Sequence, residues 1–144
     1  MTTSNALGIA GLHHVSLRVA DLDRSLALYR DVLGFTVRTS FVLLDRRFAI
    51  LETGNSGYLE LVEWPDRVHP GREDDVIWHL ALRTSDIERS FDAVSKAGYP
   101  ITRPITPLDL VNTVNGVAFS LRVAFFRGPD GEDVELLEDN SGQT

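Results

Sequence analysis

The strongest constraint on the fold of this chain is an internal repeat with a constant offset of 65 residues. The segment His14-Val-Ser-Leu-Arg-Val-Ala-Asp-Leu-Asp-Arg-Ser-Leu aligns without a gap on His79-Leu-Ala-Leu-Arg-Thr-Ser-Asp-Ile-Glu-Arg-Ser-Phe, and six of the thirteen pairs are identical. Glu60-Leu-Val-Glu and Glu135-Leu-Leu-Glu also match, each toward the end of its half. Two copies of one unit predict a body of paired, pseudo-symmetric modules rather than a solenoid.

Each copy has the pattern of a strand, a helix and three further strands. Residues 12–19 alternate apolar and polar side chains, which is the period of a half-buried strand. Asp21 then stands where a helix N-cap belongs, and Gly34 stands where that helix ends. Three strand-like stretches follow, at 35–44, 46–52 and 58–64, with a hairpin turn predicted at 55–57. In the second copy Gly98 ends the helix as Gly34 ends the first.

The predicted fold is therefore α+β, with two tandem βαβββ modules in a single domain that covers 1–144. The predicted parts are module 1 at about 12–64, a polar linker at 65–75, module 2 at about 76–139, and tails at 1–11 and 140–144. Each module has one helix, which covers one face of its sheet. The opposite faces of the two sheets must therefore be buried against each other or enclose a site. We favour a curved eight-stranded mixed sheet that forms a cleft around a site.

Composition narrows the classes of partner. The formal net charge of −7 argues against a nucleic-acid partner, which requires a clustered basic surface. No run approaches the roughly 18 apolar residues that cross a bilayer, and residues 1–11 lack the features of a secretory signal. We therefore expect a cytoplasmic protein with a small-molecule substrate and no membrane or nucleic-acid partner.

The repeat also places matched metal-binding residue types at equivalent points. His14 and His79 open the first strand of each half, and Glu60 and Glu135 lie in the fourth strand. A single histidine in a strand is more often structural than a ligand, but a match of both residue types across the repeat favours a shared role. If a two-fold axis relates the modules, the four side chains can converge.

The chain has no cysteine, so any metal site must use His, Asp and Glu. Two imidazoles and two carboxylates suit one divalent metal such as Ni²⁺, Co²⁺, Zn²⁺, Mn²⁺ or Fe²⁺. Glu63 lies three residues after Glu60, so the two glutamates point to opposite faces of their strand.

Four segments carry a resemblance to a known family: His14-Val-Ser-Leu-Arg-Val-Ala-Asp-Leu, Tyr29-Arg-Asp-Val-Leu-Gly-Phe, His79-Leu-Ala-Leu and Asp130-Gly-Glu-Asp-Val-Glu-Leu-Leu-Glu. The chain resembles the vicinal oxygen chelate superfamily, which includes glyoxalases, bleomycin resistance proteins and extradiol dioxygenases. The resemblance is greatest to the short bacterial glyoxalase I. In that branch the four metal positions are His, Glu, His and Glu, and this chain fills them with His14, Glu60, His79 and Glu135.

The resemblance implies a metal-dependent lyase or isomerase that stabilises an enediolate of a small α-oxo or α-hydroxy carbonyl compound, lactoylglutathione lyase being one such enzyme. Glu60 and Glu135 are then the candidate catalytic bases, and the resemblance does not rank them. It also implies a homodimer, in which each metal site is built within one chain or shared between two chains.

The resemblance also marks two substrate residues. Arg18 occupies the position of an arginine that contacts the glutathione carboxylate in glyoxalase I, although its repeat partner Arg83 shows that the position can also be structural. Trp64 stands where the family has an asparagine that touches glutathione. Its large indole either narrows and dries that pocket or is an aromatic residue of the core or of an interface. Residues 104–126 lack the lysine-containing, glycine-rich loop of glyoxalase I. They form either a lid over an apolar substrate or a long hairpin that packs on a partner subunit.

Three other functions are compatible with this superfamily. An epimerase would use the same chemistry on a substrate other than glutathione. An Fe(II) extradiol dioxygenase would use His14, His79 and Glu135, but Glu60 would occupy a position that such an enzyme keeps open. A drug-binding resistance protein sequesters its ligand without metal, and four intact ligand positions count against it.

Overall fold

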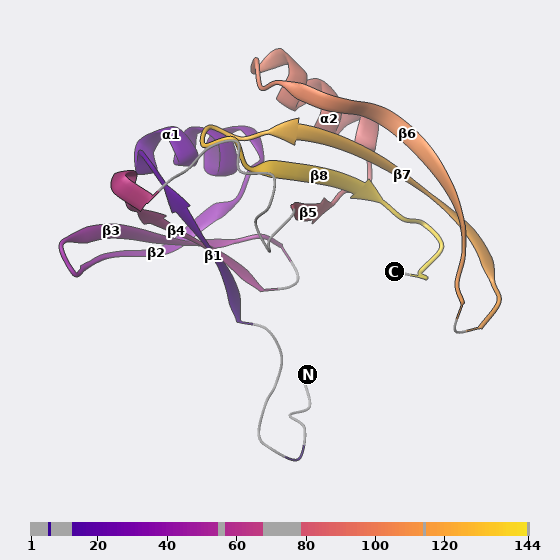
Figure 1. Cartoon of the computed structure of the whole chain (residues 1–144), viewed down its shortest axis with the longest axis horizontal. Coiled ribbons are helices and arrows are strands. Elements are labelled where there is room, and N and C mark those ends of the chain that lie inside the picture. The colour runs from indigo at the N-terminus through magenta and orange to yellow at the C-terminus, as the bar shows by residue number, and fades with distance from the viewer. Residues whose placement is uncertain (1–5, 7–12, 55–56, 68–78, 114, 144) are drawn as a thin grey trace. The chain divides into compact units, whose positions relative to one another are not determined.

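The structure is a computed structural model that describes residues 6, 13–54, 57–67, 79–113 and 115–143. The chain divides into two compact units, residues 1–68 and 69–144, and each unit contains one βαβββ module (Figure 1). The predicted N-terminal tail, apart from residue 6, and residues 68–78 of the linker and of module 2 lie outside the described residues. Within the described part of the chain, no helix has the length and hydrophobicity that a membrane span needs.

Module 1 contains a four-stranded mixed sheet in the order β1-β4-β3-β2. Its elements are β1 (His14–Val19), α1 (Leu22–Leu26), η1 (Ala27–Val32), β2 (Thr36–Leu43), β3 (Arg46–Glu52) and β4 (Tyr58–Glu63), followed by the short 3₁₀ turn η2 (Pro65–Arg67). β1 pairs parallel with β4, and the other pairs are antiparallel. The helical crossover from β1 to the rest of the sheet makes this parallel pair possible.

Module 2 repeats the arrangement, with the sheet order β5-β8-β7-β6 and one parallel pair, β5 with β8. Its elements are β5 (Leu80–Arg83), α2 (Ile87–Lys96), β6 (Ile101–Val111), β7 (Ala118–Arg127) and β8 (Asp133–Glu138). Two four-stranded mixed sheets with one helical segment each confirm the predicted α+β fold of two βαβββ modules.

The helices begin where the sequence predicts. The Asp21 carboxylate accepts hydrogen bonds from the backbone N–H groups of Asp23 and Arg24, at 2.9 and 3.2 Å, and is the N-cap of α1. The predicted single helix is, however, interrupted after one turn: α1 continues as a π-helical segment in which the Leu33 N–H donates to the Leu28 carbonyl at 2.9 Å. Gly34 then ends the helix at a φ of 78°, the left-handed conformation that favours glycine.

Residues 104–126, for which a lid and a long hairpin were the two predictions, form a long hairpin of β6 and β7. The register shifts once between Ile101 and Arg103 and again between Arg103 and Thr106. The second interval contains Pro104, which has no N–H to donate to the ladder. In Figure 1 the hairpin bends and reaches beyond the end of β8. It spans 27 residues, against 17 for the β2–β3 hairpin of module 1. Its packing on a partner subunit stays a prediction.

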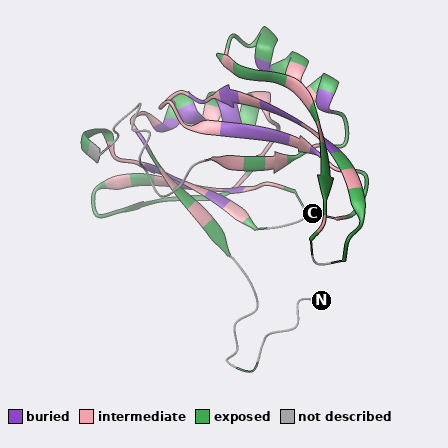
Figure 2. Cartoon of the chain, turned by 45° about the vertical axis from the view of Figure 1, so that its right-hand side comes forward, coloured by how far each residue is buried: buried purple, intermediate pink, exposed green. Residues whose placement is uncertain are grey.

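In each module the helix covers one face of the sheet (Figure 1), and buried apolar residues occur on both the helix and the strands (Figure 2). Val19, Leu59 and Leu61 are among those below 2% exposure in module 1. We call the opposite face the site face. In module 1 the strands β1 and β4 present to it His14, Ser16, Arg18, Tyr58, Glu60 and Val62.

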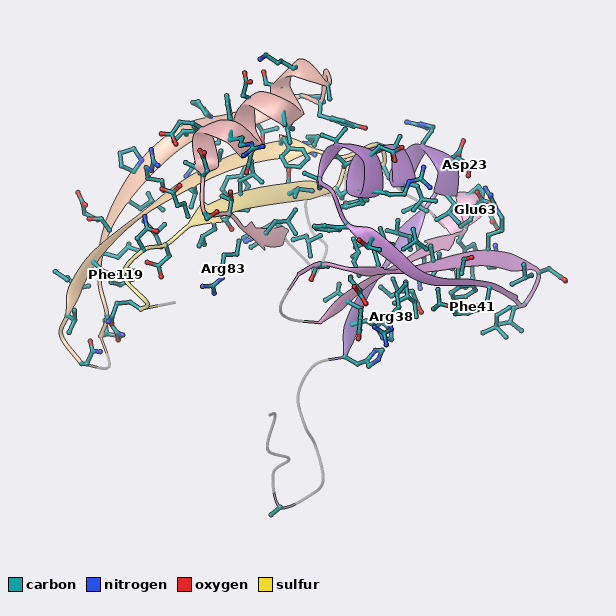
Figure 3. The ribbon with its side chains drawn as sticks, turned by 180° about the vertical axis from the view of Figure 1, so that it is seen from behind. Asp23, Arg38, Phe41, Glu63, Arg83 and Phe119 are labelled. Atoms are coloured by element: carbon teal, nitrogen blue, oxygen red, sulfur yellow. The ribbon has the colours of Figure 1, made fainter. Side chains whose placement is uncertain are left out.

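A carboxylate from the last strand ties the first turn of α1 to the sheet. The backbone N–H of Leu22 donates to Glu63 Oε2 at 2.8 Å, and Arg47 on β3 donates to the same oxygen at 2.6 Å. Arg47 also donates to Asp23 at 3.3 Å, and Figure 3 shows Asp23 and Glu63 close together at this end of the helix. Glu63 therefore faces the helix, and Glu60 faces the other way, as predicted.

Module 2 contains the same cluster. The backbone N–H of Ile87 donates to Glu138 Oε2 at 2.9 Å, and Arg122 on β7 donates to Glu138 Oε1 at 2.9 Å and to the Glu88 carboxylate. We call these two clusters the helix anchors. In both, hydrogen bonds from the arginine and then from the helix N–H hold the pKa of the glutamate below its ordinary value.

The helix anchor of module 1 predicts that the variant Glu63→Gln is less stable than wild type by an amount that depends on pH. We expect Glu63→Gln to lower the free energy of unfolding at pH 7 by about 1–2 kcal/mol, because the helix N-terminus and Arg47 lose a charged acceptor. The folded pKa of Glu63 lies below the unfolded one, so its contribution is complete above the unfolded value of about 4.3 and is lost as the pH falls through the folded value. The difference from wild type in urea unfolding should therefore shrink between pH 5 and pH 3.

The matched control is Glu52→Gln, which removes the exposed ion pair of Glu52 with Arg38. It should change the free energy of unfolding by less than about 0.5 kcal/mol at any pH. An equal loss in both variants, or a loss for Glu63→Gln that does not depend on pH, would contradict the role given to the anchor.

Candidate functional site

The parallel pairing of β1 with β4 brings His14 and Glu60 together on the site face of module 1. Ser16 lies opposite Glu60 in the register, so His14, two residues earlier on β1, points to the same face. His14 Nε2 is 3.8 Å from Glu60 Oε1. The Ser16 hydroxyl donates to the same carboxylate oxygen at 2.9 Å and holds Glu60 toward the histidine.

Module 2 builds the equivalent pair from His79 and Glu135. His79 directly precedes β5, and Ala81 takes the place opposite Glu135 that Ser16 has opposite Glu60. His79 Nε2 lies 2.8 Å from Glu135 Oε2. Phe125, the neighbour of Glu135 on β7, presents its ring edge-on to the His79 ring at 5.4 Å. Glu135 is only 8% exposed, so this pair is the more enclosed of the two.

The donor atoms within each pair lie close enough together to bind one metal ion. Two donor atoms at right angles, each about 2.1 Å from one ion, lie about 3 Å apart. The nitrogen–oxygen separation of 2.8 Å in module 2 is close to that value, whereas the 3.8 Å in module 1 requires a wider angle at the ion. The donors are those of borderline divalent metals. Within the described residues no three His, Asp or Glu side chains form a metal-binding group, and each module by itself holds two of the four predicted ligands. The union of the two pairs in one site stays a prediction.

His13 adds a contact to the first pair. Because His13 precedes His14 by one residue, the alternation of a strand predicts that its side chain turns away from the site and has a structural or rim role. The structure instead places His13 Nδ1 2.9 Å from His14 Nδ1, with the His13 ring against Tyr58. His13 precedes the first residue of β1, so the alternation of the strand does not constrain it. When His14 carries the proton in this contact, its Nε2, the nitrogen that faces Glu60, keeps its lone pair for a metal.

The two predicted substrate residues, Arg18 and Trp64, also meet on the site face of module 1. The Arg18 guanidinium carbon lies 5.1 Å from the centroid of the Trp64 ring. The backbone N–H of Trp64 donates to the Val19 carbonyl at 2.8 Å, which extends the β1–β4 pairing by one residue. Arg46, at the start of β3, lies over the same ring at 4.1 Å.

Sequence reasoning missed Ser16 and Arg46. The alternation of β1 contains a signal for Ser16, since it lies two residues after His14 and so shares its face. Arg46 has no such signal, because its contact with Trp64 depends on how β3 and β4 pair. Arg83, the repeat partner of Arg18, is exposed at the end of β5 (Figure 3).

The chain is similar to known proteins along most of its length. A family model described as Glyoxalase/Bleomycin resistance protein/Dioxygenase superfamily matches residues 11–136. A curated relative from Haemophilus influenzae, named lactoylglutathione lyase, is 29% identical over 132 residues, which are 89% of this chain and 92% of the relative.

Solved structures show the same likeness. The trypanothione-dependent glyoxalase I of Leishmania major is 28% identical with a TM-score of 0.65, over 89% of this chain and 86% of that one. A glyoxalase/bleomycin resistance protein/dioxygenase domain from Frankia sp. EAN1pec has a TM-score of 0.76 at 22% identity, over 93% of this chain and 95% of that one, and this likeness concerns the fold alone.

The hydrogen bond from Ser16 predicts a measurable effect on metal affinity. We expect Ser16→Ala to weaken the binding of Ni²⁺ or Zn²⁺ by roughly tenfold, because a partner that orients a ligand typically contributes 10- to 100-fold. Isothermal titration of the metal-free protein measures this effect. Ser120→Ala is the control, since Ser120 donates to Asp109 in the β6–β7 hairpin and should leave affinity unchanged. Equal affinities of Ser16→Ala and wild type would show that the bond does not orient Glu60 for a metal.

Proposed function

Because the chain belongs to the Glyoxalase/Bleomycin resistance protein/Dioxygenase superfamily, we propose that it is a metal-dependent lyase or isomerase of the glyoxalase type. Its substrate is a small α-oxo or α-hydroxy carbonyl compound. The observation that carries the proposal is the duplicated His–Glu pair, one on the site face of each module. The name of the Haemophilus influenzae relative, lactoylglutathione lyase, supports this class of reaction.

His14, Glu60, His79 and Glu135 are the proposed ligands of one divalent ion. Ni²⁺, Co²⁺, Zn²⁺, Mn²⁺ and Fe²⁺ all suit two imidazoles and two carboxylates. Such an ion, when bound, polarises neighbouring oxygens of the substrate and makes the adjacent C–H bond more acidic. The two carboxylates balance its charge.

Glu60 and Glu135 differ in their hydrogen-bond partners, and on this difference we base different roles for them. Ser16 donates a hydrogen bond to Glu60, whereas Ala81 offers none to Glu135 at the equivalent place. We assign to Glu60 the role of a fixed ligand. We assign to Glu135, which is buried beside Phe125, the transfer of the proton from one substrate carbon to the next.

The ligand set predicts how single variants behave. Wild-type protein should bind one divalent ion per site, and His79→Ala should weaken that binding by more than about 100-fold, beyond the usual effect of an outer-shell partner. Glu135→Gln should keep part of the metal affinity but lose turnover, because it keeps an oxygen ligand and loses the base. Metal analysis and titration measure binding. Assays with methylglyoxal and glutathione in the presence of Ni²⁺, Co²⁺, Zn²⁺ and Mn²⁺ measure turnover.

The outcomes separate the rival functions. No binding of any of these metals would remove the basis of the enzyme proposal and favour a ligand-sequestering protein. Metal binding without turnover of methylglyoxal and glutathione would exclude a lactoylglutathione lyase and direct the search to another α-oxo or α-hydroxy substrate. If Glu60→Gln kept full metal affinity with Fe²⁺ and the protein cleaved catechols with O₂, the dioxygenase would be the correct assignment.

A homodimer is the assembly we expect, and mixing experiments distinguish its two possible metal sites. One double variant, His14→Ala/Glu60→Gln, lacks the first pair, and another, His79→Ala/Glu135→Gln, lacks the second. If each site combines one pair from each chain, co-expression of the two variants should restore one intact site per mixed dimer, and with it metal binding and turnover. If both pairs of one chain form the site, the mixture should stay as inactive as either variant alone.

A further inference from the structure

The outer edge of β2, the last strand in the order β1-β4-β3-β2, pairs with no other strand among the described residues. Seven of the eight residues of β2 are exposed. An exposed edge presents free N–H and C=O groups on which another strand can pair, and proteins usually block it with proline, lysine or a bulge. β2 contains no proline and no lysine, and its pairing with β3 is regular from Thr39 to Leu43. This edge is therefore open to a further strand.

The equivalent edge of module 2 is blocked. β6 is the last strand in the order β5-β8-β7-β6, and it contains Pro104 and Pro107. Proline has no N–H to donate to a neighbouring strand, and the pairing of β6 with β7 also shifts register twice between Ile101 and Thr106. The two modules share one fold, so the fold itself does not require an open edge. The open edge is a property of module 1 alone.

The free end of the β2–β3 hairpin exposes apolar side chains. Val42 is 71% exposed and Leu44 is 81% exposed, and their neighbours Phe41 and Leu43 are exposed as well. Leu44 and Asp45 form the two-residue turn, with φ values of 53° and 57°. Such a turn favours Asn, Asp or Gly, so a leucine in it is unfavourable for the hairpin alone. An apolar side chain that is strained and exposed indicates a contact outside its own module.

The hairpin determines which backbone groups of β2 point outward. In a hairpin with a two-residue turn, the flanking residues, here Leu43 and Arg46, exchange both hydrogen bonds, and bonded and non-bonded pairs then alternate along the strands. The N–H and C=O groups of Ser40 and Val42 therefore point away from β3. They are available to a strand that approaches from outside.

We propose that β2 pairs antiparallel with β2 of a second copy of this chain, about a two-fold axis at Phe41. This axis places Ser40 opposite Val42 of the second copy, so that their outward groups exchange hydrogen bonds. Phe41, labelled in Figure 3, then lies opposite its own equivalent. Its ring already stacks on that of Phe48, with centroids 4.9 Å apart. The two copies form one row of four phenylalanine rings, and cross-strand aromatic pairs of this kind stabilise a sheet.

The charges at this edge also fit a second copy. Arg38 is the only charged residue of β2, so the axis at Phe41 brings no like charges opposite each other. It brings Arg38 alongside the turn of the second copy, which contains Asp45. Asp45 is exposed and makes no ion pair among the described residues, and the two-fold axis repeats its contact with Arg38 at both ends of the interface.

Cysteine substitution locates the interface, because the chain has no cysteine of its own. At the axis Phe41 and its equivalent form a non-hydrogen-bonded pair, with Cα atoms about 4.5 Å apart, which a disulfide can span. Phe41→Cys should therefore form a disulfide-linked dimer under mild oxidation, visible by non-reducing electrophoresis. Leu43→Cys is the matched control, since Leu43 is exposed on the same strand but lies roughly 14 Å from its equivalent in this register. It should stay unlinked.

Sedimentation of the metal-free, full-length protein measures the association itself. Val42→Lys places a charge on the open edge and should halve the mass of the assembly at a concentration at which wild type is associated. Thr102→Lys, at an exposed position of β6, is the control and should leave the mass unchanged. Circular dichroism checks that each variant is folded.

Three results would overturn the proposal. The first is a folded wild-type chain that does not associate. The second is cross-linking of Leu43→Cys as readily as Phe41→Cys. The third is an association that Val42→Lys leaves unchanged, which would belong to another surface of the chain. Because no metal is present, none of these results depends on the metal site, and a failure of the proposed enzyme activity does not affect them.

Discussion

The carboxylate at the start of each helix is the interaction on which the arrangement of each module depends. Glu63 accepts hydrogen bonds from the first N–H of α1 and from Arg47, and Glu138 does the same for α2 with Arg122. Free N–H groups and the helix dipole at an N-terminus favour a negative charge there. The anchor therefore fixes both the position of the helix on the sheet and the face to which the anchoring glutamate points.

The orientation of the anchoring glutamate also determines the face of the sheet to which the preceding glutamate, Glu60 or Glu135, points. Glu60 precedes Glu63 by three residues on the same strand, so it must point away from the helix once Glu63 points toward it. The same relation holds between Glu135 and Glu138 in β8. The parallel strand alongside then brings a histidine to the same face. A structural requirement at one glutamate thus determines the orientation of the glutamate for which we propose a functional role.

The two βαβββ modules and the candidate residues could be predicted from the sequence, because the signals that indicate them are local or repeated. The N-cap Asp21, the glycines at helix ends and the alternation of β1 are all short-range patterns, and the repeat confirmed each in a second copy. Matching residue types across that repeat singled out the four residues of the His–Glu pairs, as one predicted set of ligands whose union in a single site stays a prediction. Strand register is a long-range property, so the contact of Ser16 with Glu60 and of Arg46 with Trp64 could not be predicted. The π-helical segment after α1 could not be predicted, because the apolar residues of this stretch recur in the sequence every three or four positions, as they do in an α-helix.

The long β6–β7 hairpin has a consequence for how such a module can diverge. The offset between the repeats is 65 at the histidines and 75 at the glutamates, and the ten additional residues lie in this hairpin, which is ten residues longer than β2–β3. Its growth leaves the parallel strand pair, the anchor and the His–Glu pair unchanged, because none of them lies at the hairpin tip. A module of this kind can therefore gain or lose chain length at one end of its sheet while the His–Glu pair on its parallel strands keeps its geometry.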